Sequence, residues 1–247
     1  MIIVSKNNPQ VKELASLKEK KGRRERGTFL VEGEKMVREC VQSGMKVLRL
    51  AVREGYGGDT YSLPFLTLGD DAFRAVCDEK TPRQIAAEVE IPTPRLRPPT
   101  SPCLLLDGVS DPANVGAIVR TAVASGFGEI YLASCVDPFA PKSVRASMSG
   151  VFFATLYRGE RAEILSALEG VELIAADMNG QNVFCFEPPA RYALCIGNEG
   201  NGLSEEVARL AKRKVRIPMD VRTESLNASV AAGIFMYLFK KKTFERL

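Results

Sequence analysis

The chain has 247 residues, 45% of them hydrophobic, with neither a long uncharged apolar run nor a signal sequence, so we expect a soluble cytoplasmic protein of one or two domains. It has six widely separated cysteines and no histidine, which excludes Ser-His and Cys-His catalysis and argues against a metal site. The net charge of +4 is uneven, because residues 1–50 carry a balance of +6 and the rest −2.

The first part of the chain alternates between helical and extended patterns. Asn8-Pro9 opens a predicted helix that reaches about Lys20, with the proline in its first turn. Residues 29–33 read as a strand ending in a turn, residues 34–43 as a helix, and residues 47–52 as a second strand. The pattern predicts a small α/β domain over residues 1–95.

A basic block lies between the first predicted helix and the first strand. A solvated helix end is one interpretation of this block, and a surface that contacts phosphate groups of a nucleic acid is the other. The clustering of positive charge in one half of the chain favours the second. The candidate RNA-binding residues are Lys18, Lys20, Lys21, Arg23, Arg24 and Arg26.

Residues 91–102 contain five prolines in twelve positions. Proline cannot continue a helix or a central strand, so this segment is typical of a stiff linker. We place the linker at residues 96–102 and a second domain at residues 103–247.

The second domain alternates strictly between short apolar strands and helices, which predicts a parallel sheet covered by helices. The predicted strands are 103–106, 130–133, 153–156, 171–175 and 193–196, and the predicted helices are 114–125, 141–148, 161–168, 204–212 and 227–242. Ligands bind such sheets at the carboxyl ends of the strands. Three unusual loops follow apolar segments and are therefore expected to meet there.

The first loop runs from Asp107 to Gly116. Asn114 is placed either to cap the following helix or to serve a site. Arg120 lies six positions later, on a different face of that helix, so it is either a solvated side chain or a contact to another molecule.

The second loop, residues 196–204, contains three glycines in six residues, which allows a close backbone approach to a ligand. It lacks the Lys-Ser/Thr pair of a phosphate loop, and its GxxGxG order differs from the dinucleotide fingerprint. Acidic side chains near the following helix favour a neutral or cationic ligand.

The third loop, residues 218–227, leads into a helix that is apolar nearly all round. Ser225 or Asn227 is expected to cap this helix. The helix itself is expected to be buried against the sheet or in a subunit interface.

These loops resemble the three sequence motifs of SpoU-type, or TrmH-like, RNA 2′-O-ribose methyltransferases of the SPOUT superfamily. The matching segments are Asn114–Ala122, Gly197–Gly200, Ile217–Met219 and Ser225–Asn227, in the family's order and spacing. The first half, with Phe29–Gly33 behind a basic helix, is similar to the L30e-like RNA-binding domain that many members carry.

The resemblance implies a small α/β L30e-like domain followed by an α/β, parallel-sheet methyltransferase domain with a C-terminal trefoil knot. It implies a homodimer that transfers a methyl group from S-adenosylmethionine to a ribose 2′-hydroxyl of RNA. Ribosomal RNA is favoured over transfer RNA by analogy with the appended RNA-binding half. The implied catalytic residues are Asn114, Arg120, Glu199, Ser225 and Asn227. The implied cofactor-binding residues are Gly197, Asn198, Gly200, Ile217, Pro218, Met219 and Leu226.

One position departs from the family pattern. Members often have glycine two residues after the Pro-Met pair, where this chain has Val221. This substitution and the basic first half leave an alternative, a non-catalytic RNA-binding or ribosome-assembly factor that retains the fold. A nicotinamide-dependent oxidoreductase is a third interpretation, and the glycine order argues against it.

Overall fold

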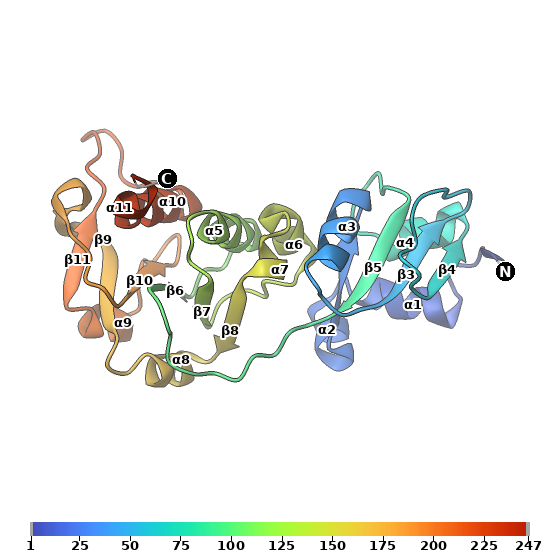
Figure 1. Ribbon diagram of the computed structural model, residues 1–247, viewed down its shortest axis with the longest axis horizontal. Helices are drawn as coiled ribbons and strands as arrows, with labels where there is room; N and C mark the ends of the chain where they lie inside the picture. Colours follow the sequence, from blue (N-terminus) through green and yellow to red (C-terminus); the bar gives the residue numbers. More distant parts are fainter. Residues whose placement is uncertain (1, 246–247) are drawn as a thin grey trace. The chain divides into compact units, whose positions relative to one another are not determined.

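Two β-sheets organise the computed structural model, which describes residues 2–245 (Figure 1). One structural unit consists of the chain up to Pro92 together with Asp137–Phe152, and the other of Thr93–Val136 together with the chain from Phe153 onward. The segment 137–152, which lies in the second half of the sequence, thus packs with the first unit.

The first unit has a five-stranded mixed sheet in the order β1-β4-β3-β5-β2. Its strands are β1 (Ile2–Ile3), β2 (Thr28–Glu32), β3 (Val47–Arg53), β4 (Phe65–Leu68) and β5 (Ile85–Glu90). Its helices are α1 (Pro9–Ser16), α2 (Lys20–Arg26), α3 (Glu34–Gln42), α4 (Asp70–Val76) and α6 (Pro141–Ser147). A short helix, α7 (Gly150–Phe153), ends the inserted segment. β5 runs antiparallel to its neighbours β3 and β2, whereas the other pairs are parallel.

The predicted helix from Asn8 to Lys20 is in fact two helices. Asn8 caps α1 as expected, with its side chain accepting from the backbone N–H of Gln10. α1 ends at Ser16, and α2 begins four residues later. Gly22 of α2 lies against the end of α1, because a Cβ there would come within 2.1 Å of the Ser16 carbonyl oxygen. The close helix crossing therefore requires glycine at this position.

The second unit has a six-stranded sheet in the order β11-β9-β10-β6-β7-β8, and every pair in it is parallel. Its strands are β6 (Cys103–Asp107), β7 (Glu129–Ala133), β8 (Thr155–Gly159), β9 (Glu172–Asn182), β10 (Tyr192–Gly197) and β11 (Arg213–Arg216). Its helices are α5 (Pro112–Ala124), α8 (Arg161–Ala167), α9 (Glu205–Leu210), α10 (Ala228–Phe239) and α11 (Lys241–Phe244), with a 3₁₀ turn η1 (Val183–Cys185). The predicted parallel sheet is confirmed.

Three strands differ from the sequence prediction. β9 continues beyond the predicted end at Ala175 to Asn182. β8 begins at Thr155 and not at Phe153, because Phe153 is the last residue of α7. β11 was not expected at all, since its sequence is Arg-Lys-Val-Arg and only Val215 is buried. A single apolar residue in a charged run gives no strand pattern.

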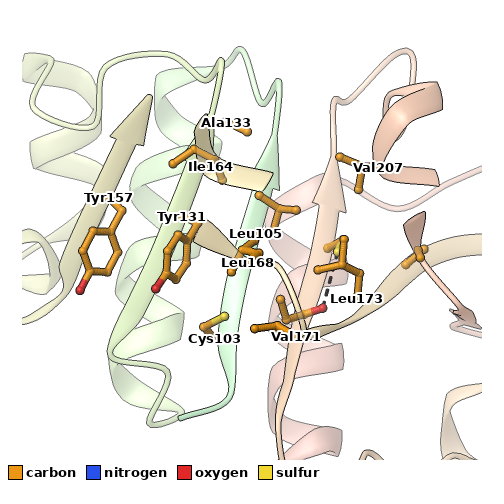
Figure 2. Close-up of a cluster of buried hydrophobic side chains, with 14 residues drawn as sticks. Cys103, Leu105, Tyr131, Ala133, Tyr157, Ile164, Leu168, Val171, Leu173 and Val207 are labelled. Carbon is orange, nitrogen blue, oxygen red and sulfur yellow. Dashed lines mark hydrogen bonds between the residues drawn. The ribbon is translucent and has the colours of Figure 1, made fainter. Parts of the chain in front are cut away.

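Helices cover both faces of the second sheet. Cys103 and Leu105 of β6 lie in a buried cluster with Ile164 of α8 and Val207 of α9 (Figure 2). Leu104 and Leu106 alternate with them and point to the opposite face. α10 packs beside α5 and against β10 (Figure 1), as expected for a helix that is apolar nearly all round.

The strand order reverses between β10 and β6. The chain passes from β6 outward to β7 and β8, and then returns on the other side of β6 to form β9 and β10. Such a reversal opens a crevice at the carboxyl ends of the two central strands, the usual ligand position in parallel sheets. The first and second loops leave the sheet at this point.

Candidate active site

A cavity of about 630 Å³ lies at the carboxyl edge of the second sheet. Its volume is in the range of small-molecule sites. It is lined by Ala176–Met178 after the regular part of β9, Ile196–Gly202, Val215–Ile217, Met219, Glu224–Ala228, Ala231 and Phe235. The second and third loops therefore line one pocket, whereas the first loop, which we expected to share it, does not line it.

The second loop is a tight turn held by its own backbone. The N–H and C=O groups of Asn198 and Gly202 exchange hydrogen bonds of 2.8 and 2.9 Å, and Asn198 Oδ1 accepts from the N–H groups of Gly200 and Asn201. Gly197 lies directly against this turn, since a Cβ there would come within 2.2 Å of the Gly202 carbonyl carbon. Only glycine fits at position 197 in this conformation.

A chain of side-chain hydrogen bonds joins all three loops. Asn227 Nδ2 donates to Asn114 Oδ1 at 3.0 Å, and Asn114 Nδ2 donates to Glu199 Oε1 at 2.8 Å. Three residues that are far apart in sequence thus form one polar cluster. All three were predicted as catalytic residues from the sequence.

The carboxylate of Glu199 accepts hydrogen bonds from several donors besides Asn114. The backbone N–H groups of Ser110 and Asp111, the Ser110 hydroxyl and Asn198 Nδ2 all donate to it. Desolvation acts to raise the pKa of Glu199, but the hydrogen bonds from Asn114 and from the loop backbone outweigh it, so the pKa is lowered from 4.5. Glu199 is therefore an ionised anchor for the first loop.

Of the two interpretations of Asn114, the helix cap is wrong. The cap is Asp111, whose side chain accepts from the N–H of Ala113, with Pro112 in the first turn of the helix. Asn114 lies inside the helix and is buried. Its amide group is thereby free to bridge Glu199 and Asn227 instead of serving the helix end.

Arg120 is exposed on α5 and does not line the cavity. It makes no ion pair with any residue between positions 2 and 245, and it lies on a different face of α5 from the buried Asn114. This position is compatible with both interpretations of Arg120, a solvated side chain and a contact to another molecule.

Asn227 caps α10, as the sequence allowed for either Ser225 or Asn227. Its Oδ1 accepts from the N–H groups of Ser229 and Val230 while its Nδ2 reaches Asn114. Ser225 is exposed and lines the cavity. Val221, the departure from the family pattern, is fully exposed and does not line the cavity.

Six of the seven predicted cofactor-binding residues line the cavity, namely Gly197, Asn198, Gly200, Ile217, Met219 and Leu226. Pro218 does not line it. Sequence reasoning missed Asp177 and Met178, which border the cavity from β9, and Phe235 from α10. Asp177 is paired with Lys214 at 2.7 Å. The sequence signal for Asp177 and Met178 is their position just after the predicted apolar strand 171–175, and Phe235 has no signal beyond its place in the apolar helix.

The basic block divides into exposed and engaged side chains. Arg23 is only 3% exposed, pairs with Asp137 at 2.7 Å and donates to two backbone carbonyls. Because Arg23 holds the inserted segment in the first unit, it is not available as a phosphate contact, contrary to our expectation. Lys18 donates to the Ala75 carbonyl oxygen. Lys20, Lys21 and Arg24 are exposed.

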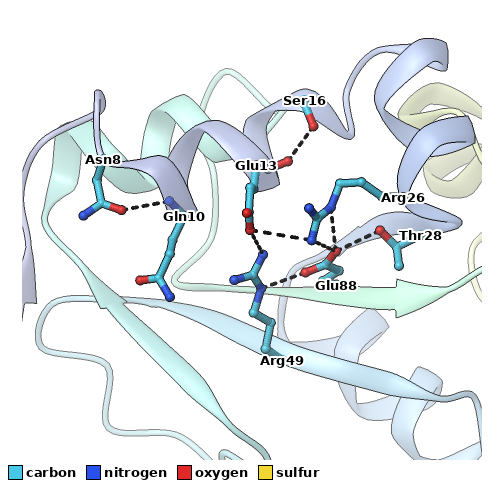
Figure 3. Close-up of polar contacts among 8 residues, drawn as sticks. All are labelled: Asn8, Gln10, Glu13, Ser16, Arg26, Thr28, Arg49 and Glu88. Carbon is cyan, nitrogen blue, oxygen red and sulfur yellow. Dashed lines mark hydrogen bonds and ion pairs between the residues drawn. The ribbon is translucent and has the colours of Figure 1, made fainter.

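Arg26 belongs to a polar network of the first unit that includes Glu88, Arg49 and Thr28 (Figure 3). The buried carboxylate of Glu88 accepts from Arg26, from Arg49 at 2.7 Å and from the Thr28 hydroxyl at 2.8 Å. Burial acts to raise the pKa of Glu88, but the Thr28 hydrogen bond and the arginine charges lower it overall. Arg26 therefore has a structural role in the first unit.

Within the described part of the chain, no three Cys, Asp or Glu side chains are grouped so that they could hold a metal ion. No helix between residues 2 and 245 has the length and apolar character needed to cross a membrane.

Comparisons with known proteins identify a family that covers the three loops of the candidate site. Residues 101–237 match the SpoU rRNA Methylase family, and residues 8–87 match the MRM3-like substrate binding domain. The chain belongs to the SpoU rRNA Methylase family. The resemblance found in the three motifs is thereby confirmed, together with the α/β fold class.

Individual relatives extend over nearly the whole chain. The 23S rRNA (guanosine(2553)-2'-O)-methyltransferase RlmP of Bacillus subtilis is 32% identical over 95% of this chain and 97% of its own length. The 23S rRNA (uridine(2479)-2'-O)-methyltransferase of Streptomyces viridochromogenes is 29% identical over 95% of this chain and 90% of its own. The structure of an AdoMet-bound rRNA methyltransferase from Sinorhizobium meliloti superposes with a TM-score of 0.87 at 28% identity, covering 98% of both chains.

Proposed function

We propose that this protein transfers a methyl group from S-adenosylmethionine to a ribose 2′-hydroxyl of ribosomal RNA. The observation that carries the proposal is the hydrogen-bonded cluster of Asn227, Asn114 and Glu199 beside the cavity formed by the second and third loops. It brings together residues from all three SpoU motifs. Relatives that span the chain are named as 23S rRNA 2'-O-methyltransferases, which favours an enzyme over the non-catalytic alternative.

The cavity fits S-adenosylmethionine in size and chemistry. Ile196, Ile217, Leu226 and Phe235 provide apolar walls for an adenine ring. Ile217 and Leu226 lie outside the strand and helix ladders, so their backbone groups can recognise polar edges of a ligand. Gly197 allows the turn to fold back on the strand and thereby shapes this wall of the cavity. When bound, this cofactor supplies a methyl group on a positively charged sulfur.

Alignment of the acceptor hydroxyl is the main task of the protein side chains. Ser225 and Asn227 orient the ribose hydroxyl at the mouth of the cavity. Arg120, polarised by the phosphate of the RNA, assists loss of the hydroxyl proton or stabilises the developing oxyanion. A guanidinium is a poor general base, which favours the second role. Glu199 acts indirectly, by holding Asn114 in place, because its carboxylate oxygens already accept hydrogen bonds from the first loop.

The first unit is the RNA-recognition module in this proposal. Lys20, Lys21 and Arg24 are exposed on α2 and can contact phosphate groups. The match of residues 8–87 to a substrate binding domain supports this assignment, and we retain the predicted L30e-like character for it. The proposed domains are residues 1–95 and 103–247, and the segment 137–152 of the second packs within the first unit.

The proposed assembly is a homodimer with a trefoil knot at the C-terminal end of each chain. Val230 and Tyr237 of α10 are 51% and 47% exposed, and their spacing of seven residues places them on one helix face. Such an apolar face beside α5 is suited to a second copy of this chain. A dimer also gives the exposed Arg120 a neighbouring site to complete.

The test replaces Arg120 and measures two properties of the variant. Arg120→Ala should abolish methyl transfer while leaving the dissociation constant for S-adenosylmethionine, measured by calorimetry, within about twofold of the wild-type value. Arg209→Ala, which removes an exposed arginine from α9, is the control and should retain activity. Full activity of Arg120→Ala would remove this residue from the mechanism. Absence of cofactor binding by the wild-type protein would favour the non-catalytic alternative.

A further inference from the structure

Asp107 is a fully buried carboxylate at the carboxyl end of β6, outside the residues assigned to catalysis or cofactor binding above. Its Oδ1 accepts from Arg161 Nε at 2.6 Å. Its Oδ2 accepts from the backbone N–H of Ser204 at 2.7 Å. A buried carboxylate is costly unless all its partners are in place, so this arrangement fixes Arg161 and Ser204 firmly.

The contact with Asp107 matters because Ser204 lies at the end of a loop that lines the cavity. Ser204 ends the glycine-rich loop and caps α9, its hydroxyl accepting from the N–H of Val207. At the other end of the loop, Gly197 pairs with Asp107 in the sheet register. Both ends of the loop, residues 197 and 204, are thus fixed at one residue of the neighbouring strand.

The residue after Asp107 holds the middle of the same loop. The carbonyl oxygen of Gly108 accepts from Asn198 Nδ2 at 2.9 Å. Asn198 in turn shapes the turn through its Oδ1, which accepts from Gly200 and Asn201. Residues 107 and 108 therefore fix the start, the turn and the end of the loop that lines the cavity.

We infer that Asp107 is a positioning residue for the cofactor loop, which it holds through the backbone N–H of Ser204 in the conformation that binds S-adenosylmethionine. Asp107 does not line the cavity and acts only through the loop. The inference rests on the proposed function, since it concerns affinity for the same cofactor.

The same sheet offers a control for the cost of disturbing a buried carboxylate. Glu129 at the opposite, amino end of β7 is also buried, pairs with Arg97 at 2.9 Å and accepts from the backbone N–H of Thr100 at 2.9 Å. It resembles Asp107 in burial and in the chemistry of its partners, but it lies far from the loop. Glu129→Gln therefore reports general destabilisation without loop displacement.

Ser204 allows the contact to be removed without changing Asp107. Its φ of −60° is compatible with proline, so Ser204→Pro deletes the N–H donor and places the proline ring against Asp107 Oδ2. Ser204→Ala removes only the hydroxyl that caps α9. The difference between these two variants reports the contact between residue 204 and Asp107, and an Asp107→Ala background, which has room for the ring, removes that contact from both.

The experiment measures the dissociation constant for S-adenosylmethionine by calorimetry and the unfolding temperature for each variant. Asp107→Asn and Ser204→Pro should each weaken cofactor binding roughly tenfold, as expected for loss of a hydrogen bond to a charged group. The KM for the cofactor should rise while kcat changes less. Ser204→Ala and Glu129→Gln should bind within about twofold of wild type. In an Asp107→Ala background, Ser204→Pro should add no further loss.

Wild-type affinity in both Asp107→Asn and Ser204→Pro would overturn the inference. So would an equal loss of affinity in Glu129→Gln, because the effect would then follow stability and not the loop. If the wild-type protein itself failed to bind S-adenosylmethionine, the proposed function would fall instead, which is a distinguishable result.

Discussion

Gly197 shows how a single missing side chain shapes the cavity. The backbone of Gly202 and Leu203 occupies the space that a Cβ at position 197 would need. The sequence could predict the importance of glycine in this loop from the GxxGxG pattern. It could not indicate which glycine is obligatory, because that depends on how the turn folds back on the strand.

Replacement of this glycine should therefore disable the site. Gly197→Ala is expected to lower the free energy of unfolding by about 1–3 kcal/mol and to weaken binding of S-adenosylmethionine by at least roughly tenfold, because the turn must move. Gly128→Ala is the matched control, since a Cβ there meets no atom within 4 Å. Chemical denaturation and calorimetry measure the two effects. Equal behaviour of the two variants would show that the loop is not rigid.

The lowered pKa of Glu199 leads to a pH prediction. A carboxylate with a folded-state pKa below its ordinary 4.5 stabilises the protein above that pH, and the contribution disappears as the pH falls through the folded-state value. The difference in unfolding temperature between wild type and Glu199→Gln should thus be greatest near neutral pH and shrink below about pH 4.5. The effect should be small because the side chain is exposed. A difference that does not vary with pH would contradict this account.

At the scale of elements, the sequence predicts strands better than helix ends. The apolar runs that became β6, β7 and β10 were placed to within one residue at their starts. The start of α5 was misplaced because both Asp111 and Asn114 are good capping residues, and local sequence does not decide between them. The actual choice depends on Glu199 and Asn227, which lie 85 and 113 residues away from Asn114 in sequence.

The strand β5 carries a buried and an exposed carboxylate that make a sharp comparison. Glu88→Gln should reduce the free energy of unfolding by about 3 kcal/mol, because it removes the buried charge that pairs with Arg26 and Arg49 and leaves them only the exposed carboxylate of Glu13. Glu90, on the same strand, is 48% exposed and pairs with Lys46, so Glu90→Gln should cost less than about 1 kcal/mol. Urea unfolding of both variants checks this. A loss of similar size in the two variants would exclude a structural role for the Glu88 network.

At the scale of the whole molecule, the exposed face of α10 predicts the oligomeric state. Replacing Val230 and Tyr237 together with arginine should convert a dimer into a monomer, because charges on a buried apolar interface are strongly unfavourable. Sedimentation measurements detect the change. Lys242→Glu alters an exposed lysine of α11 and should leave the assembly intact. A monomeric wild-type protein would contradict the proposed dimer.

Family membership, the parallel sheet and most of the cavity could be inferred from sequence because the motifs lie in loops that follow apolar strands. The inserted segment 137–152 could not be assigned to the first unit, since the contact between Arg23 and Asp137 spans 114 residues. The role of Asp107 could not be inferred from the sequence either. A single aspartate before a glycine looks like an ordinary turn until Ser204 and Arg161 are seen beside it.

The most direct test of the account is labelled methyl transfer from S-adenosylmethionine to total RNA from cells that lack this protein, followed by mapping of the label. The account predicts label on a ribose 2′-oxygen of ribosomal RNA and none with the Arg120→Ala variant. Methyl label on a base, or label found only in transfer RNA, would contradict the account.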